Sequence, residues 1–483
     1  MKNVLGDLNP ALVFKYFEEI SQIPRGSGNE KEISDFLYKF AKDLNLEVIQ
    51  DEFLNILIRK PATEGYENCP GIILQGHMDM VCEKNKDVNH DFEKDPIDLR
   101  IIDDMIYANG TTLGADNGIA VAMSMAVLAS DNLSHPSLEV LITSDEEAGM
   151  TGAMNLDGEL LKGKYIINLD SEEEGYLLVS CAGGNRSYVS LPLTYKPVDD
   201  NKQALLIEVK GLLGGHSGMD IIKQRANSNV VMGRILNLLD VDYDLVEVNG
   251  GSKNNAIPRE CEAKVVVNKK QIDDLKASLS KIEEILKNEF KTTDPGLKLI
   301  VEETSIDKVM TDECKSKTIL LLNLIPNGIQ TMSMDIDGLV ESSTNLGVVK
   351  TADNQISFES AVRSSVATLR QSINDRTKLL ADSVGATLEI TDGYPAWEYA
   401  KNSKLEQICV DVYEKLTDKK PVITAIHAGL ECGLLLDKMN GAEAISMGPN
   451  MFEVHTPNEH LSIPSVKNVW EYLVKVLESM NQY

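Results

Sequence analysis

The chain has 483 residues, of which 47 are basic and 75 acidic, so its formal net charge is −28. The hydrophobic fraction of 43% is enough for a large buried core and excludes a disordered chain. The acidic excess and the lack of a Lys/Arg-rich cluster argue against a nucleic-acid-binding protein, since such proteins hold phosphates with a basic surface.

Neither a membrane protein nor a disulfide-rich secreted protein is expected. No run approaches the roughly 18 apolar residues of a membrane-spanning helix, and the N-terminus does not have the pattern of a signal peptide. The seven cysteines are scattered and show no CxxC spacing, which disfavours a disulfide framework and a Cys-type zinc site. A reducing, cytoplasmic location is therefore predicted.

The first 180 residues alternate between helical and extended patterns. Helical periodicity begins at Asn9, and a second helix is expected to start near residues 28–30. Extended runs are expected at 46–49 and 54–58, buried strands at 71–79, 138–143 and 164–169, and a helix at 116–130. Apolar strands that alternate with helices are typical of an open α/β sheet.

A different pattern begins after about residue 180. Residues 203–304 show the order strand, helix, strand, strand, helix, strand, and a looser version of this order recurs at 313–391. The repetition predicts an inserted α+β domain that is a duplicated ferredoxin-like unit.

The first pattern returns after about residue 395. A helix is expected at 403–417, a strand at 442–448 and a final helix at 465–481. The predicted layout is an α/β domain formed by residues 1–183 and 396–483, interrupted by an inserted domain of residues 184–395.

Two polar motifs adjoin predicted elements of the first part. His77 and Asp79 end the strand at 71–79, and residues two apart on a strand point to the same side. The pair therefore fits a metal ligand and a carboxylate that orients its imidazole, although a solvated strand end is the alternative. Asp116 precedes a helix and could be a simple N-cap, but the glycines around it indicate a close backbone approach.

Further carboxylates and a histidine follow other predicted strands. Asp145, Glu146 and Glu147 come after the strand at 138–143, and they repel one another unless they form a solvated turn or hold cations. Asp170 closes the next strand, and His455 follows the strand at 442–448.

These side chains are expected to converge, because the carboxyl ends of strands in an open α/β sheet share one crevice. Histidines and carboxylates without cysteine fit Zn²⁺, Mn²⁺ or Co²⁺. Two such ions bridged by a carboxylate would form a hydrolase site.

Eight motifs in order carry a resemblance to a known family. They are GHMDMV, TTLGADNG, SDEEAGMTGA, INLD, GGHSG, NAIP, HAGLECG and HTPNEHLSI. The chain resembles, over nearly its whole length, the di-zinc metallopeptidases that include aminoacylases, carboxypeptidase G and carnosinases, and most of all their bacterial Xaa-His-cleaving branch. The resemblance implies an α/β zinc-peptidase (phosphorylase/hydrolase-like) catalytic domain with an inserted lid domain.

The resemblance also implies the metal ligands. His77 and Asp170 would bind one Zn²⁺, Glu147 and His455 would bind the other, and Asp116 would bridge the two. Mn²⁺ or Co²⁺ are possible substitutes.

Catalytic roles follow in the same way. Glu146 would be the general base that takes a proton from a metal-activated water, and Asp79 would orient His77. The resemblance further implies a cis peptide bond between Asp116 and Asn117. His216 would donate a hydrogen bond to the oxyanion.

Substrate contacts are implied for residues of the insert and for one residue beyond it. His216, Asn255 and Arg363 would bind the substrate, with Arg363 suited to its free carboxylate by the bidentate guanidinium. His427 would line the substrate pocket with support from Glu431. The other three histidines, His90, His135 and His460, are expected at the surface.

The predicted function is a cytosolic metallo-dipeptidase that hydrolyses Xaa-His (carnosine-like) and similar unblocked dipeptides. A broader tripeptidase or an N-acyl amino-acid amidohydrolase would use the same metal ligands and stays open. A non-catalytic binding protein is disfavoured, because every expected ligand and Glu146 are present. The sequence leaves the dipeptide specificity, the metal used and the choice between monomer and homodimer open.

Overall fold

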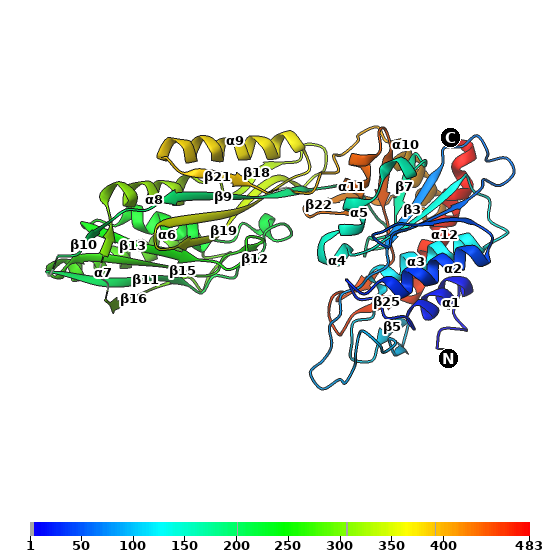
Figure 1. The fold of residues 1–483 in the computed structure, drawn as a ribbon, viewed down its shortest axis with the longest axis horizontal. Helices are drawn as coiled ribbons and strands as arrows, with labels where there is room; N and C mark the ends of the chain where they lie inside the picture. The colour runs from blue at the N-terminus through cyan, green and yellow to red at the C-terminus, as the bar shows by residue number, and fades with distance from the viewer. Residues whose placement is uncertain (1–3, 200, 306–307, 392) are drawn as a thin grey trace. The chain divides into compact units, whose positions relative to one another are not determined.

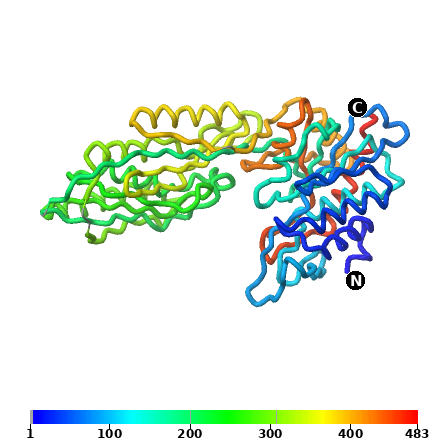
Figure 2. The backbone as a smooth tube through the Cα atoms, in the orientation of Figure 1, coloured from blue at the N-terminus to red at the C-terminus, as the bar shows by residue number. Residues whose placement is uncertain are grey.

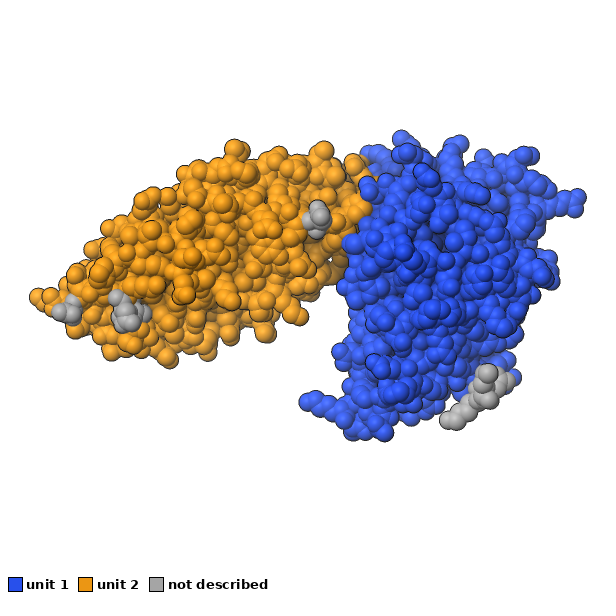
Figure 3. All heavy atoms as spheres, viewed as in Figure 1, with its two compact units in different colours: residues 1–180, 399–425, 430–483 blue, residues 181–398, 426–429 orange. Residues whose placement is uncertain are grey.

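The computed structural model describes residues 4–199, 201–305, 308–391 and 393–483. They form two compact units (Figure 3), unit 1 with Met1–Ser180, Tyr399–Ala425 and Leu430–Tyr483, and unit 2 with Cys181–Glu398 and Ile426–Gly429. The sequence analysis had placed residues 426–429 with the α/β part. They join unit 2 because Ile426 O accepts a hydrogen bond from Ala182 N at 3.1 Å and the imidazole of His427 reaches Ser343.

Unit 1 is built on an eight-stranded mixed sheet with the order β1-β2-β6-β3-β7-β23-β8-β22. The neighbours β6, β3, β7 and β23 run parallel, and every residue of β3, β6 and β7 is buried. Burial on both faces explains why these strands read as continuous apolar runs. The strands are β1 Glu47–Gln50, β2 Ile56–Lys60, β3 Ile72–His77, β6 Leu138–Thr143, β7 Tyr165–Asn168, β8 Tyr176–Cys181, β22 Val422–Ile426 and β23 Glu443–Ser446.

Helices cover this sheet, and the C-terminal segment returns to the unit that the N-terminal segment forms (Figures 1 and 2). The helix α3 is buried along nearly its whole length, because it contacts both α1 and β3. The helices are α1 Ala11–Ile20, α2 Lys31–Asp43, α3 Ala115–Ala129, α4 Glu146–Gly149, α5 Thr151–Asn155, α10 Lys404–Thr417, α11 Glu431–Lys438 and α12 Ile463–Ser479. Within the described residues no helix is long and apolar enough to cross a membrane.

Two features of unit 1 differ from expectation. A small antiparallel sheet was not predicted, and it consists of β4 Leu99–Ile102, β5 Met105–Ala108, β24 Met451–Phe452 and β25 His460–Ser462. The prediction that His135 lies at the surface is wrong, since its side chain is fully buried and its Nδ1 lies 2.8 Å from Pro136 O.

Unit 2 is built on one antiparallel sheet with the order β16-β11-β15-β13-β19-β20-β9-β21, to which β18 adds beside β19. Its strands are β9 Gly183–Pro192, β11 Lys202–Lys210, β13 Tyr243–Gly250, β15 Cys261–Asn268, β16 Lys298–Thr304, β18 Gly328–Met332, β19 Val340–Thr351, β20 Gln355–Ser364 and β21 Thr387–Ile390. Its helices are α6 Ser228–Leu238, α7 Ile272–Glu289, α8 Asp312–Leu324 and α9 Ala367–Val384. Two small ladders pair β10 Tyr195–Pro197 with β17 Lys308–Met310, and β12 Gly215–His216 with β14 Ala256–Ile257.

The large sheet repeats one topology. The strands β11, β13, β15 and β16 lie in the order fourth, first, third, second, with α6 and α7 as the connecting helices. The strands β9, β19, β20 and β21, with α8 and α9, lie in the same order. This is the strand order of a ferredoxin-like unit, and the two copies join where Gly250 of β13 pairs with Val349 of β19.

Contrary to the expectation, the second copy does not lie wholly within 313–391. Its first strand is β9, which precedes the entire first copy in the chain, so one copy is inserted into the other. Sequence periodicity cannot reveal this arrangement, because the partner of β9 in the sheet, β20, begins 163 residues after β9 ends (355 − 192).

Candidate active site

Polar side chains follow four parallel strands of unit 1. His77 is the last residue of β3, Asp170 comes two residues after β7, and Glu146 and Glu147 open the short helix α4 after β6. His455 lies in the loop between β24 and β25, which follows β23. Because the carboxyl ends of parallel strands meet at one edge of a sheet, these side chains come together.

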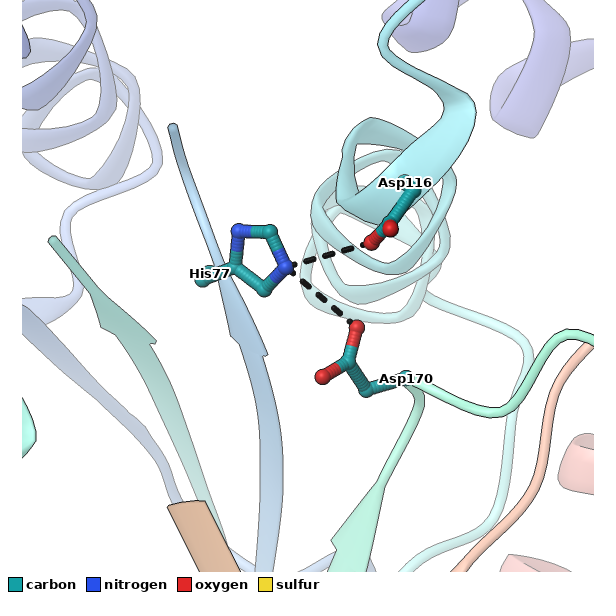
Figure 4. Close-up of side chains that lie close together, drawn as sticks. All are labelled: His77, Asp116 and Asp170. Carbon is teal, nitrogen blue, oxygen red and sulfur yellow. Dashed lines mark hydrogen bonds and ion pairs between the residues drawn. The ribbon is translucent and has the colours of Figure 1, made fainter. Parts of the chain in front are cut away.

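Asp116 lies between the two histidines. Its Oδ1 is 3.2 Å from Nε2 of His77, and its Oδ2 is 3.1 Å from Nε2 of His455. Figure 4 shows His77, Asp116 and Asp170 turned toward one another, with Oδ1 of Asp170 at 3.4 Å from the same Nε2. The peptide bond between Asp116 and Asn117 is cis, as the resemblance implied.

Two sets of side chains offer ligand atoms that lie within 4.8 Å of one another. One set is His77, Asp116 and Asp170, and the other is Asp116, Glu147 and His455. A third set joins Glu146 and Glu147 to His77, with Oε2 of Glu146 at 3.9 Å from Nε2. Two of these three sets contain the residues that the resemblance groups around one ion each, and the ligand roles stay predictions.

The charges of this cluster fit bound cations. Burial lowers the pKa of His77, but the carboxylates of Asp170, Asp116 and Asp79 outweigh this effect and raise it well above its usual value. Burial raises the pKa of Glu146. The Oδ1 atom of Asp170 is buried and accepts no hydrogen bond within the described part of the chain. Carboxylates crowded in this way need positive charge, and a donor set of imidazoles and carboxylates fits Zn²⁺ and similar divalent ions.

Asp79 contacts both the end of β3 and the segment that follows β6. Its Oδ1 lies 3.2 Å from Nδ1 of His77, and its carboxylate accepts hydrogen bonds from the backbone N of Glu146 and Glu147 at 3.1 and 3.2 Å and from Oγ of Ser27 at 2.8 Å. This geometry matches the predicted role of orienting the imidazole.

The sequence analysis missed the groups that hold the turn before α3. The buried carboxylate of Glu459 accepts hydrogen bonds from four consecutive backbone amides, Leu113 to Asp116, at 2.8 to 3.3 Å. On the other side of the turn, buried Arg25 donates to Gly114 O and to Met78 O. No local pattern reveals these partners, since a single acid or base in a loop reads as solvated charge.

Gly114 is required at this turn. Its φ is 67°, and a Cβ atom there would lie 2.5 Å from Nη2 of Arg25. The glycine that the sequence analysis took as a sign of close backbone approach therefore makes room for the arginine.

Glu431 belongs to unit 1, and its expected support of His427 in unit 2 stays a prediction. Its buried carboxylate accepts hydrogen bonds from Nε2 of Gln75 at 2.6 Å and from Oγ1 of Thr143 at 2.7 Å, within unit 1. Burial raises the pKa of Glu431 to about 7. His427 belongs to unit 2, where its Nε2 lies 2.7 Å from Oγ of Ser343.

Within unit 2 the predicted substrate-binding residues form a second cluster. The loop at Gly218 joins two of them, because a Cβ atom there would lie 2.4 Å from His427 O and 3.1 Å from Cε1 of His216. Arg363 is close enough to lower the pKa of both histidines, together with burial, which is the larger cause, and the pKa of His427 falls to about 3. Asn255 is exposed next to β14, and its carbonyl accepts a hydrogen bond from Ser217 N at 2.8 Å.

The hydrogen bonding of His216 defines its tautomer. Its Nδ1 accepts a hydrogen bond from Met219 N at 3.1 Å, so in the neutral ring the proton is on Nε2. Since burial lowers the pKa of His216, the ring is neutral at neutral pH and Nε2 is a hydrogen-bond donor.

A model of peptidase family M20/M25/M40 matches residues 73–479. The chain belongs to this family. The identification made from the eight motifs is confirmed, and the chain is a hydrolase of the metallopeptidase class.

Two relatives match the M20 chain over its length. It is 38% identical, over 479 residues and 99% of each chain, to the cytosol non-specific dipeptidase of Escherichia coli strain K12. The crystal structure of aminoacylhistidine dipeptidase from Vibrio alginolyticus matches with a TM-score of 0.94 and 37% identity, covering 99% of this chain and 98% of that one. Aminopeptidase PepT from Bacillus cereus, at 17% identity and a TM-score of 0.57, covers 98% of this chain and 99% of its own and shares the fold.

Proposed function

We propose that this M20 peptidase is a dipeptidase that hydrolyses Xaa-His and similarly small, unblocked dipeptides. The observation that carries the proposal is the position of Asp116, whose two oxygens face different imidazoles while the carboxylate of Glu146 lies beside them. The names of the full-length relatives from E. coli and V. alginolyticus, both dipeptidases, support the dipeptidase assignment. Since one is named a non-specific dipeptidase and the other an aminoacylhistidine dipeptidase, the preference for Xaa-His is the finer part of the proposal.

We propose two Zn²⁺ ions, one held by His77 and Asp170, the other by Glu147 and His455, with Asp116 shared. Mn²⁺ or Co²⁺ would fit the same oxygen and nitrogen donors. Bound ions of this kind supply a Lewis acid that polarises the scissile carbonyl and makes water a stronger acid. Glu146 accepts the proton of the attacking water and passes it to the leaving amine. Asp79 holds the imidazole of His77 in its orientation.

Unit 2 is proposed to be the lid domain that binds the substrate. The Nε2–H group of His216 donates a hydrogen bond to the oxyanion, and Arg363 binds the free carboxylate of the dipeptide. Arg363 forms no ion pair with a carboxylate among the described residues, and its Nε is buried without a partner. A half-buried guanidinium whose Nε has no partner is ready for an anionic ligand. Asn255 and His427 complete the proposed substrate contacts.

A substrate panel tests this function. The enzyme is loaded with Zn²⁺, Mn²⁺ or Co²⁺ and assayed on carnosine, other dipeptides, a tripeptide and an N-acetyl amino acid. Hydrolysis of unblocked dipeptides with the highest kcat/KM for Xaa-His is expected. Preference for the tripeptide or for the N-acetyl amino acid would replace the proposal with a tripeptidase or an amidohydrolase, and hydrolysis of all dipeptides alike would remove the Xaa-His preference. A cytosolic location, which the name of the E. coli relative gives for that protein, is part of the proposal.

A further inference from the structure

Tyr394 lies beside Arg363 in unit 2 and has not been given a role. Nη1 of Arg363 donates a hydrogen bond to the hydroxyl of Tyr394 at 2.7 Å. Nε of Arg363 has no hydrogen-bond partner among the described residues, so the bond from Nη1 is the one that orients the guanidinium there. The direction of the guanidinium therefore depends on the tyrosine hydroxyl.

The backbone of Tyr394 is held firmly at the edge of β9. Its N donates to Gly184 O at 3.0 Å, and its O accepts from Gly184 N at 3.1 Å and from Nη1 of Arg370 at 2.7 Å. On the other edge of β9, Gly184 is paired with Arg363 of β20. Tyr394, Gly184 and Arg363 thus lie in one row across the sheet.

Gly184, in the middle of this row, has no side chain that would block the contact between Tyr394 and Arg363. A Cβ atom on Gly184 would lie 2.7 Å from the hydroxyl of Tyr394 and 2.8 Å from Cζ. A second glycine, Gly429 of the HAGLECG motif, packs against the same ring, since a Cβ there would lie 2.7 Å from Cε2. Contacts this short show that both glycines are fitted to the tyrosine ring.

We propose that Tyr394 is a positioning residue for the substrate: its hydroxyl holds the guanidinium of Arg363 in the orientation that binds the carboxylate of the dipeptide. The inference rests on the proposed role of Arg363. Burial raises the pKa of Tyr394, which keeps the hydroxyl protonated at neutral pH. A guanidinium fixed before binding loses less side-chain freedom when the ligand arrives, so the hydroxyl improves affinity without touching the reacting atoms.

The test compares Tyr394→Phe with Arg363→Ala and with the double variant in the full-length, metal-loaded enzyme. Removing one hydrogen bond to a charged group is expected to raise KM for an Xaa-His dipeptide about tenfold, with kcat changed by less than about twofold. The decisive readout is the ratio of kcat/KM for the dipeptide acid to that for its C-terminal amide. This ratio is expected to fall in Tyr394→Phe, whereas general damage to the fold would lower both values alike. Tyr188→Phe, on the same strand β9, is the matched control and is expected to leave the ratio unchanged.

The outcomes separate this inference from the function on which it rests. In the Arg363→Ala background, Tyr394→Phe is expected to have no further effect, because the two residues act as one unit. If Arg363→Ala lowers the ratio and Tyr394→Phe does not, the role of Tyr394 is wrong and the proposed carboxylate site stands. If Arg363→Ala leaves the ratio unchanged, the assignment of Arg363 fails and the inference fails with it. Gly184→Ala places a methyl group against the hydroxyl of Tyr394 and is therefore expected to lower the ratio as Tyr394→Phe does.

Discussion

At the scale of single residues, the chemistry is divided between neighbours. Glu146 and Glu147 are adjacent, yet Oε1 of Glu147 lies 3.1 Å from Nε2 of His455, whereas Glu146 lies nearer to His77. These positions suit the proposed roles of Glu147 as a metal ligand and of Glu146 as the general base. Their division follows from the start of α4, where successive side chains point in different directions.

Replacing Glu146 by Gln tests this division. The amide cannot accept a proton, so kcat is expected to fall by about 10²- to 10⁴-fold. Metal content is expected to stay at the wild-type level, because His77, Asp116, Glu147, Asp170 and His455 are all retained. The variant Glu173→Gln, which changes an exposed acid close in sequence to Asp170, is the control and should leave kcat intact. Substantial turnover by metal-loaded Glu146→Gln would contradict the assignment of the base.

His216→Ala tests the oxyanion donor. The loss of the Nε2 donor is expected to lower kcat by about 10²- to 10³-fold. Metal content should not change, since the proposed ligands all lie in unit 1 and His216 lies in unit 2. Steady-state kinetics with metal analysis measures both quantities, and His90→Ala serves as the control. An unchanged kcat would exclude the oxyanion role.

At the scale of elements, the turn before α3 decides where Asp116 is placed. The carboxylate of Glu459 accepts hydrogen bonds from the backbone amides of the turn, and Arg25 donates one to Gly114 O. The turn is therefore fixed by two residues from distant parts of the chain. Burial of both charges places them in a medium where hydrogen bonds are strong and unpaired groups are costly.

Glu459→Gln is expected to weaken this turn. The amide loses the negative charge and half of the acceptor capacity, which is expected to lower the free energy of unfolding by about 2 kcal/mol. The melting temperature of the metal-free protein measures the effect. Glu453→Gln changes an exposed carboxylate of the same loop and should leave the melting temperature unchanged. A melting temperature equal to that of the wild type in Glu459→Gln would show that the four amide bonds do not stabilise the turn.

At the scale of the whole molecule, the two units have separate cores. Most of the buried apolar residues of β9 to β21 and of the helices α6 to α9 form one large cluster that lies entirely in unit 2. The proposed metal ligands belong to unit 1 alone. Binding of metal to the folded state is therefore coupled to the stability of one unit.

Metal removal tests this separation. Calorimetry of the full chain is expected to show two transitions, of which chelation lowers only one, because a ligand stabilises the structure that binds it. At a metal concentration of about 1,000 times Kd the expected stabilisation is about 4 kcal/mol. His455→Ala, which removes one ligand, should shrink the metal-dependent shift of that transition and leave the other in place. Equal shifts of both transitions would contradict the separation.

The positions of the proposed ligands at the edge of the sheet could be predicted because they depend on local patterns. Apolar runs identify buried strands, and a histidine or carboxylate that follows such a run lies at the carboxyl edge of the sheet, as His77, Asp170 and His455 do. The motifs around them identify the M20 family, and the composition excludes a disordered chain.

Tertiary structure alone decided the contacts between residues far apart in the chain. The four amides of the turn before α3 meet Glu459 more than 340 residues later, β9 pairs with β20, Glu431 binds Gln75, and Tyr394 reaches Arg363 across Gly184. Such contacts leave no local periodicity, because a buried polar side chain and a solvated one occupy a loop with the same sequence pattern. Their partners are set by how the chain packs, and only packing excludes the water that would otherwise satisfy these groups.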